Sequence, residues 1–248
     1  MKTVRFALRE PDRFACSRRQ TPRGVATTTT TTTTTTAPHF RICSKKSANA
    51  AHHAFANFAG GTFALRMLNL QFNPFPVLTT ARLILREPQP TDVDALFRVR
   101  SNPALMEFIP RPIARTPADA ATVLTMVSDG LARGEKINWA ITRPADDELI
   151  GMIGYVNIYP EHHRAEIGYI LRDDCHRQGL MSEALAAAVA YGFAEMKLHS
   201  IEAIIRPANA ASRTLIERHG FVLEGIFKEN CYFNGAYLDS MVYSKLAV

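Results

Sequence analysis

The sequence has few cysteines, and none is spaced for a metal site or a disulfide framework. The four are Cys16, Cys43, Cys175 and Cys231, and no two of them form a CxxC pair. Histidines occur as adjacent pairs, at 52–53 and 162–163, and not at the i, i+4 spacing of a helical metal site. This pattern predicts no disulfide scaffold and no metal. It is typical of a reducing compartment, and we expect a cytoplasmic protein.

Long apolar runs and a basic folded surface are also missing. No stretch reaches the roughly 18 apolar residues that a membrane helix needs. The net charge of +6 comes from residues 1–66, which hold 11 basic and 2 acidic residues, whereas the remainder holds 18 and 21. A nucleic-acid-binding face needs clustered Lys and Arg on a folded domain. We therefore expect neither a membrane nor a nucleic acid as a partner.

Residues 1–66 lack the periodicity of helices and strands. They contain ten consecutive threonines, from Thr27 to Thr36, followed by small and basic residues. Such composition predicts a disordered, low-complexity segment. Two interpretations stay open: an Arg-rich targeting segment, or a start codon assigned too early. Globular patterning begins at Met67, and we expect one domain over residues 67–248.

From residue 81 the pattern is that of a mixed α/β (α+β) domain. The run ARLILRE at 81–87 alternates like a strand. A helix is predicted from Thr91, with Asp94 closing a capping box, and another from Thr116, with Asp119 in the same role. Further strands are predicted at 137–142, 149–158, 164–171, 201–205, 221–229 and 236–246, and further helices at 180–196 and 209–218.

The segment CHRQGLMSEAL at 175–185 connects a strand-like run to a helix-like run. A helix start offers unpaired N–H groups and a partial positive charge, and a glycine lets a phosphate approach the backbone. The groups that would face an anion belong to Arg177, Gln178, Gly179, Leu180, Met181 and Ser182. An isolated glycine is also common in ordinary strand–helix connections, so this signal alone leaves phosphate binding open.

The surroundings of this loop carry a resemblance to a family. AEIGYIL precedes it, SEAL continues it, and RPANAASRTLIERHGFVLEG follows further on. This combination resembles the GNAT superfamily of acetyl-CoA-dependent N-acetyltransferases. LTTARLILR and NGAYLDSMVYSKL resemble its RimJ/RimL-type branch of ribosomal-protein N-terminal acetyltransferases. The resemblance covers about residues 78–246. It implies the GNAT fold, a mixed, mostly antiparallel twisted sheet of six to seven strands flanked by about four helices, and acetyl-CoA as cosubstrate.

The resemblance also implies which residues bind the cofactor. The family's pyrophosphate loop has the form Gln/Arg-x-x-Gly-x-Gly/Ala, and His176, Gly179 and Met181 occupy its marked positions. Only the glycine matches, which puts side-chain contacts in doubt more than backbone ones. In the same way Ile170 and Leu171 would pair with the pantetheine arm through their backbone, and Asn209 would contact that arm. Core packing and a helix N-cap are the respective alternatives.

Acetyl transfer requires an uncharged amine, whereas an α-amino group (pKa ~8) or a lysine (~10.4) is mostly protonated at neutral pH. A carboxylate can accept that proton. Glu166 is the candidate base, because it lies in an otherwise apolar strand and because many GNAT enzymes place their base in this strand. An ion pair with Arg164 or Arg172 is the alternative.

The departing CoA thiolate needs a group that donates a proton or a hydrogen bond to its sulfur. Many GNAT enzymes place a tyrosine seven residues after the motif asparagine, but this chain has Ile216 there. The RimJ/RimL-type pattern has a serine three residues after the asparagine, and Ser212 matches it. Ser212 would stabilise the thiolate by a hydrogen bond, the alternative being a surface serine. Tyr169 and Tyr232 are the reserve candidates.

The expected acceptor is an amine: a protein N-terminus, a lysine or a small amine. We expect its pocket to involve residues 106–112, where Glu107 could bind a cation, and residues 231–237. Two other functions stay open. One is acetylation of a small molecule such as a polyamine, an amino acid or an antibiotic, and the other is a non-catalytic CoA-binding sensor. We expect a monomer or a homodimer.

Overall fold

The structure, a computed structural model, describes residues 68–247, so the predictions for residues 1–66 lie outside it. No helix of the described part is long and apolar enough to cross a membrane. Its strands are β1 (Leu78–Thr79), β2 (Ile84–Arg86), β3 (Ile137–Thr142), β4 (Gly151–Tyr159), β5 (Arg164–Leu171), β6 (Ser200–Ile205), β7 (Val222–Phe233) and β8 (Ala236–Leu246). Its α-helices are α1 (Val93–Arg100), α2 (Pro103–Met106), α3 (Pro117–Ala132), α4 (Leu180–Ala194) and α5 (Ala210–Arg218), and three 3-10 turns are η1 (Pro90–Asp92), η2 (Pro160–His162) and η3 (Asp173–Cys175).

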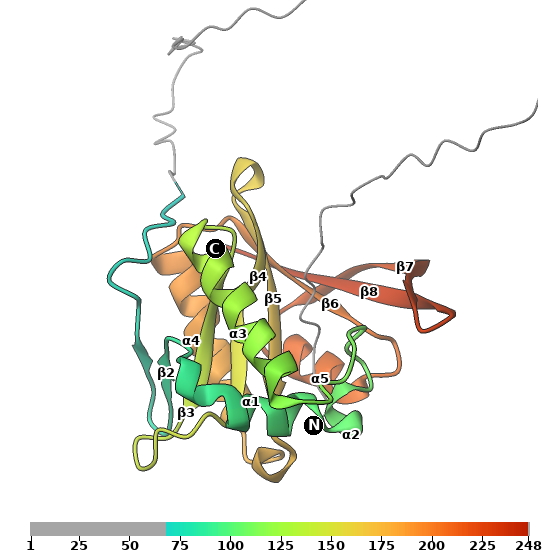
Figure 1. Cartoon of the computed structure of the whole chain (residues 1–248). Helices are drawn as coiled ribbons and strands as arrows, with labels where there is room; N and C mark the ends of the chain where they lie inside the picture. The colour runs from blue at the N-terminus through green and yellow to red at the C-terminus, as the bar shows by residue number, and fades with distance from the viewer. Residues whose placement is uncertain (1–67, 248) are drawn as a thin grey trace, which may run out of the picture. The chain divides into compact units, whose positions relative to one another are not determined.

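The eight strands form one sheet in the order β1-β2-β3-β4-β5-β6-β8-β7 (Figure 1). Neighbouring strands run antiparallel except β5 and β6, which are parallel. The predicted mixed, mostly antiparallel class is confirmed. The sheet has one strand more than expected, and a fifth helix is present, because β1 spans only two residues and α2 only four. Elements so short carry no readable periodicity.

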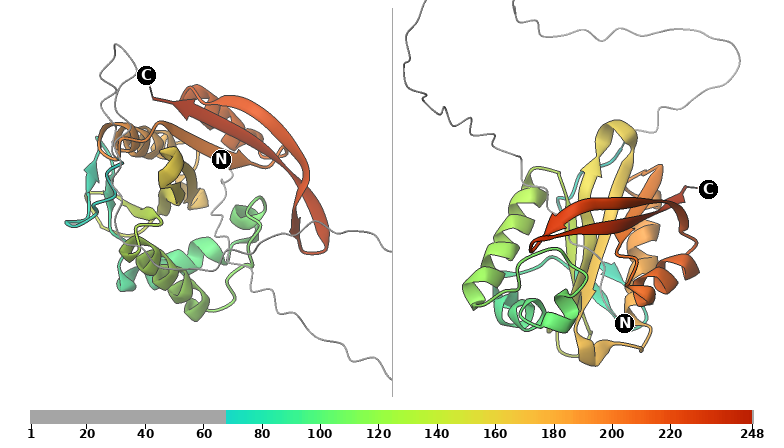
Figure 2. Two further views of the ribbon diagram at one scale, coloured as in Figure 1. Left: turned by 90° about the horizontal axis from the view of Figure 1, so that it is seen from above. Right: turned by 90° about the vertical axis from the view of Figure 1, so that its right-hand side faces the viewer.

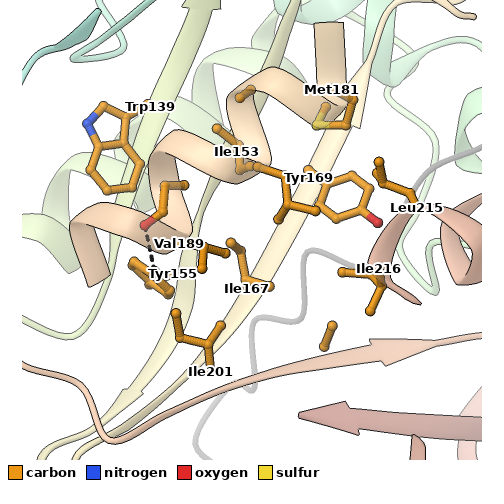
Figure 3. Close-up of a cluster of buried hydrophobic side chains, with 14 of the residues drawn as sticks. Trp139, Ile153, Tyr155, Ile167, Tyr169, Met181, Val189, Ile201, Leu215 and Ile216 are labelled. Atoms are coloured by element: carbon orange, nitrogen blue, oxygen red, sulfur yellow. Dashed lines mark hydrogen bonds between the residues drawn. The ribbon is translucent and has the colours of Figure 1, made fainter. Parts of the chain in front are cut away.

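Helices cover both faces of the sheet. Successive side chains of a strand point to opposite faces, so each central strand contributes to an apolar core on both sides of the sheet. Ile167 and Tyr169 of β5 pack with α4 and α5 in one apolar cluster, shown in Figure 3. Ile170 of the same strand packs with α1, α2 and α3 in a second cluster, together with Ala140 and Met152. In β3 and β5, odd-numbered residues therefore face α4 and α5, and even-numbered residues face α1, α2 and α3.

The helix starts test the two predicted capping boxes. The box of Thr116 and Asp119 is present, and the Asp119 carboxylate accepts the Thr116 N–H at 2.9 Å. The box predicted for Thr91 and Asp94 is wrong. The capping acid is Asp92, which accepts the N–H of Gln89 at 2.7 Å and forms an ion pair with Arg86 at 2.8 Å. The chain therefore enters a 3-10 turn before α1 begins.

The last two strands form a long hairpin that extends beyond the rest of the domain (Figure 2). Its turn is the predicted one: Asn234 and Gly235 both have positive φ, at 50° and 82°. A two-residue turn with both φ positive matches the twist of the flanking strands. The hairpin gives β6 an antiparallel neighbour and closes the sheet on that side.

Candidate active site

The parallel pair β5–β6 ends soon after it begins. Its register consists of Arg164 with Ser200, Ala165 with Ile201, and Glu166 with Glu202. Both strands continue, β5 to Leu171 and β6 to Ile205, but the described residues contain no further β5–β6 pair. The two strands therefore separate after Glu166. We call the space between them the fork.

Alternation decides which backbone groups of β5 face the fork. The N–H of Arg172 bonds to Ile150, so Arg172 and every second residue before it pair with the β4 side. Consistently, the carbonyl oxygen of Ile170 lies 2.4 Å from the position that a Cβ on Gly151 would take. The backbone of Ile170 thus pairs with β4, and the expected pairing of Ile170 with the cofactor arm stays a prediction. The residues whose backbones are directed to the fork are Ile167, Tyr169 and Leu171.

The end of β5 is tied to the loop that follows it. The ring of His176 contacts the Leu171 carbonyl oxygen at 2.9 Å, and because a carbonyl only accepts, Nε2 of His176 donates. Burial lowers the pKa of His176, which favours this neutral form at physiological pH. His176 thus holds the loop against the end of β5, and the carbonyl oxygen of Leu171 already accepts a hydrogen bond from within the domain.

The loop enters α4 through two residues in left-handed conformations. Arg177 has φ 61° and Gly179, the N-cap residue, has φ 76°. The helical ladder begins with the N–H of Glu183 bonded to the Gly179 carbonyl at 3.0 Å. The N–H groups of the first turn precede that bond, as at every helix start, and an anion can take them. They belong to Leu180, Met181 and Ser182. Gln178 and Arg177 lie on the exposed side of the same turn.

Arg82 adds a cation to this loop that the sequence analysis did not single out. Its guanidinium donates to the Gln178 carbonyl at 2.9 Å and to the Glu183 carboxylate at 2.7 Å. It is also the only described group within 4 Å of a Cβ built on Gly179, at 3.5 Å. No local pattern could reveal it, because Arg82 and Gln178 are 96 residues apart in the chain.

On the α5 side of the fork, Asn209 and Ser212 are buried at the start of the helix. The Asn209 side chain accepts the Ser212 N–H at 3.2 Å, so the N-cap role is present. The Tyr169 ring extends from β5 toward α5, and its hydroxyl points to Leu215 and Ile216 (Figure 3). Burial raises the pKa of Tyr169 well above its usual value, and the Ser212 side chain beside it partly offsets that effect. Tyr169 therefore stays protonated as a hydrogen-bond donor.

Glu166 lies on the opposite face of the sheet, the face of α1 and α3. It is 2% exposed, and its Oε2 accepts a hydrogen bond from Asn157 Nδ2 at 2.7 Å. A β-bulge creates this contact. Tyr155 pairs with Ile167 and Asn157 with Glu166, so Val156 is an extra residue in β4. With regular pairing instead of the bulge, Val156 would pair with Glu166, and Asn157 would face α4 as Tyr155 does.

The two arginines expected as alternative partners of Glu166 engage other carboxylates. Arg164 pairs with Glu202 at 3.5 Å. Arg172 pairs with Glu148 at 2.9 Å and with Asp174 at 2.7 Å.

The structure thus brings Tyr169 and Ser212 together on one face and puts Glu166 on the other, with the fork between them. Tyr232 belongs to neither group. It lies on the hairpin, 65% exposed, with its ring centroid 4.9 Å from that of Tyr237.

Comparisons with known proteins agree with this geometry. Residues 82–222 match the sequence model of the acetyltransferase (GNAT) domain. The uncharacterized N-acetyltransferase YoaA of Bacillus subtilis is 34% identical over 68% of this chain and 96% of its own length. The ribosomal-protein-serine acetyltransferase of Escherichia coli is 36% identical over 41% of this chain and 56% of its own length. A GNAT-family acetyltransferase from Bacillus anthracis has a crystal structure that superposes with TM-score 0.62 and 27% identity, covering 69% of this chain and 98% of that one.

Proposed function

This chain belongs to the GNAT acetyltransferase family and is an acetyl-CoA-dependent N-acetyltransferase, and we propose that Glu166 is the general base that activates its acceptor amine. The observation that carries the proposal is the position of Glu166. It is the last residue of β5 to pair with β6 before the fork opens, and Asn157 fixes its carboxylate. A proton acceptor held in place at the point where two reactants meet contributes to rate both by position and by chemistry.

The proposed cosubstrate geometry follows from the fork. The pyrophosphate would bind the N–H groups at the start of α4, with Arg177 and Arg82 supplying positive charge. The pantetheine arm would enter the fork and pair with the backbone of Ile167 and Tyr169, with Asn209 across from them. RimL was crystallised with coenzyme A; it is 24% identical to this chain with TM-score 0.63, which supports the shared fold.

The two faces of the sheet would then serve the two halves of the reaction. The amine approaches from the α1 and α3 face, gives a proton to Glu166 and attacks the thioester carbonyl. A C–N bond forms, the C–S bond breaks, and CoA leaves as a thiolate, which takes up the second proton that the nitrogen loses on becoming an amide. Ser212 and Tyr169, on the α5 face, donate hydrogen bonds toward that sulfur. Because burial raises the pKa of Tyr169, its hydroxyl should donate a hydrogen bond to the thiolate and should not transfer its proton to it.

We propose an amine of a protein, and its N-terminal amine in particular, as the acceptor; a relative in Escherichia coli is named ribosomal-protein-serine acetyltransferase, which supports a protein substrate. The test is a turnover screen with acetyl-CoA, following CoA release against N-terminal peptides, free amino acids, polyamines and aminoglycosides. We expect peptides with small first residues to react fastest. Faster turnover of free small amines would favour a small-molecule enzyme, and CoA binding without turnover of any amine would favour a sensor.

A further inference from the structure

The sheet face that carries Glu166 is organised in three rows of side chains. Ala140, Met152 and Ile170 are in register across β3, β4 and β5 and form the apolar row beneath α1. Two residues further along each strand, the next row consists of Asn138, Gly154 and Gly168. Beyond that row Asn157 pairs with Glu166, and Lys136 comes directly before β3. Core packing explains the first row, but not the polar residues of the other two.

The middle row is buried and polar, and it has few side chains. Gly154 and Gly168 face each other directly and bring no side chains. Asn138 leans over Gly154: its Oδ1 lies 2.6 Å from the position that a Cβ on Gly154 would take. Asn138 is 1% exposed, yet neither Oδ1 nor Nδ2 has a hydrogen-bond partner among the described residues. A buried amide without partners costs free energy, so such a group marks a place where a polar ligand group fits.

Two buried cations face the same layer between the sheet and its helices. Arg100 is 7% exposed and lies one turn beyond Leu96, on the side of α1 that packs on the sheet. Lys136 is 9% exposed, and its stem passes so close to α3 that a Cβ on Gly130 would lie 2.4 Å from its Cε. Neither cation forms an ion pair with any residue in 68–247, and Nε of Arg100 has no hydrogen-bond partner there.

Electrostatics agrees with this arrangement. Burial lowers the pKa of Arg100 to about 10, with a smaller contribution from Arg111. Burial also lowers the pKa of Lys136; the charge of Glu135 opposes this shift, and the charges of Arg133 and Arg111 add to it. Arg111, in the segment between α2 and α3, contributes to the electrostatics of both groups. A buried cation that forms no ion pair is stabilised by an anion.

We infer that Asn138, Arg100 and Lys136 form an anion subsite for the acceptor, and that the preferred acceptor carries a carboxylate close to its reactive amine. This inference rests on the proposed function and adds a substrate class to it. The amine would lie at Glu166, and the carboxylate would lie over Gly168, beside the Asn138 amide. A carboxylate accepts hydrogen bonds from the Asn138 amide and the Arg100 guanidinium at once, and both amine and carboxylate would then be held for attack.

Two sources supply such a carboxylate. A free amino acid has it next to the amine, and a peptide has it in an acidic side chain at its second residue. A polyamine, by contrast, would bring a further positive charge to the two buried cations Arg100 and Lys136. The subsite therefore selects against that class of acceptor by repulsion.

The first test measures binding, so it does not depend on turnover. The full-length protein is saturated with CoA and titrated by calorimetry with N-acetylserine and with N-acetylserinamide, which differ only in the carboxylate. A second pair, the N-acetylated amides of the dipeptides serine–glutamate and serine–glutamine, distinguishes the peptide source. We expect the acid of at least one pair to bind tenfold or more tightly. Equal binding in both pairs would overturn the inference.

The second test assigns the preference to these residues. Lys136→Gln should remove most of the preference for the acid, Lys136→Arg should keep it, and Lys197→Gln, an exposed lysine after α4, should leave it unchanged. A preference that survives both Lys136→Gln and Arg100→Gln would overturn the assignment, and the wild-type titrations stand if a variant fails to fold. Acid-selective binding without turnover of any amine would contradict the proposed function alone, whereas turnover without acid preference would contradict this inference alone.

Discussion

Replacing Glu166 by glutamine tests the proposed base most directly, because the structure limits what else the change can alter. The amide oxygen of glutamine can still accept the Asn157 hydrogen bond that now measures 2.7 Å, so the side chain should keep its place. The change removes the proton acceptor. Positioned general bases contribute about 10²–10⁴-fold, so the barrier should rise by about 3–5 kcal/mol at about 1.36 kcal/mol per decade.

The assay is a pH–rate profile of wild type and Glu166→Gln with one acceptor peptide, read as CoA release. The neutral fraction of an α-amine with pKa ~8 rises about tenfold from pH 7 to pH 9, so the defect should narrow by up to about tenfold. Acetyl-CoA affinity should not change. Glu202→Gln is the matched control: it lies in register on β6 but pairs with Arg164, and we expect a loss below about tenfold. Full activity of Glu166→Gln at pH 7 would refute the reasoning.

Four further changes test the rest of the domain. Gly179→Asp should weaken CoA binding at least tenfold by calorimetry without changing the circular dichroism spectrum, because it adds a negative charge where phosphates approach and meets only Arg82. Ser212→Ala should lower turnover by less than tenfold at unchanged CoA affinity, because water can replace a hydroxyl donor; a loss as large as that of Glu166→Gln would contradict its role. Bonds from Thr80 and Arg82 hold the pKa of Glu183 below its usual 4.5, so the stability it adds is complete above about pH 4.5 and lost below. The Tm difference between wild type and Glu183→Gln should therefore be constant from pH 8 to 6 and shrink in acid, and a constant difference down to pH 3 would disprove the linkage. A chain that begins at Met67 should match the full chain in Tm and CoA affinity, and a clear loss in either would show that residues 1–66 contribute.

Features that depend on residues close together in the sequence could be predicted, and features that depend on contacts between distant elements could not. The helix at Thr116, the turn at Asn234-Gly235 and the loop at Gly179 are local signals, and the structure has all three. The capping box at Thr91 failed because a neighbouring acid, Asp92, binds Arg86 of another element.

The site was predictable only in part, for the same reason. Glu166 could be singled out as a lone acid in an apolar strand. Asn157 could not, because the bulge at Val156 breaks the alternation that a sequence reading assumes. Asn138 and Lys136 become noticeable only when their burial and missing partners are known, and these depend on helices packed from elsewhere in the chain.

The short β5–β6 ladder also has a mechanical consequence. Strands β1 to β5 form one antiparallel panel and β6, β8 and β7 another, and three residue pairs join the two panels. Regions joined by few backbone bonds tend to open as separate cooperative units. We expect amide hydrogen exchange to report two panels with different protection. A molecule that pairs with the backbone of β5 inside the fork would add hydrogen bonds at this junction and couple the two panels. If the cosubstrate binds there as we propose, its binding would make the whole domain more rigid.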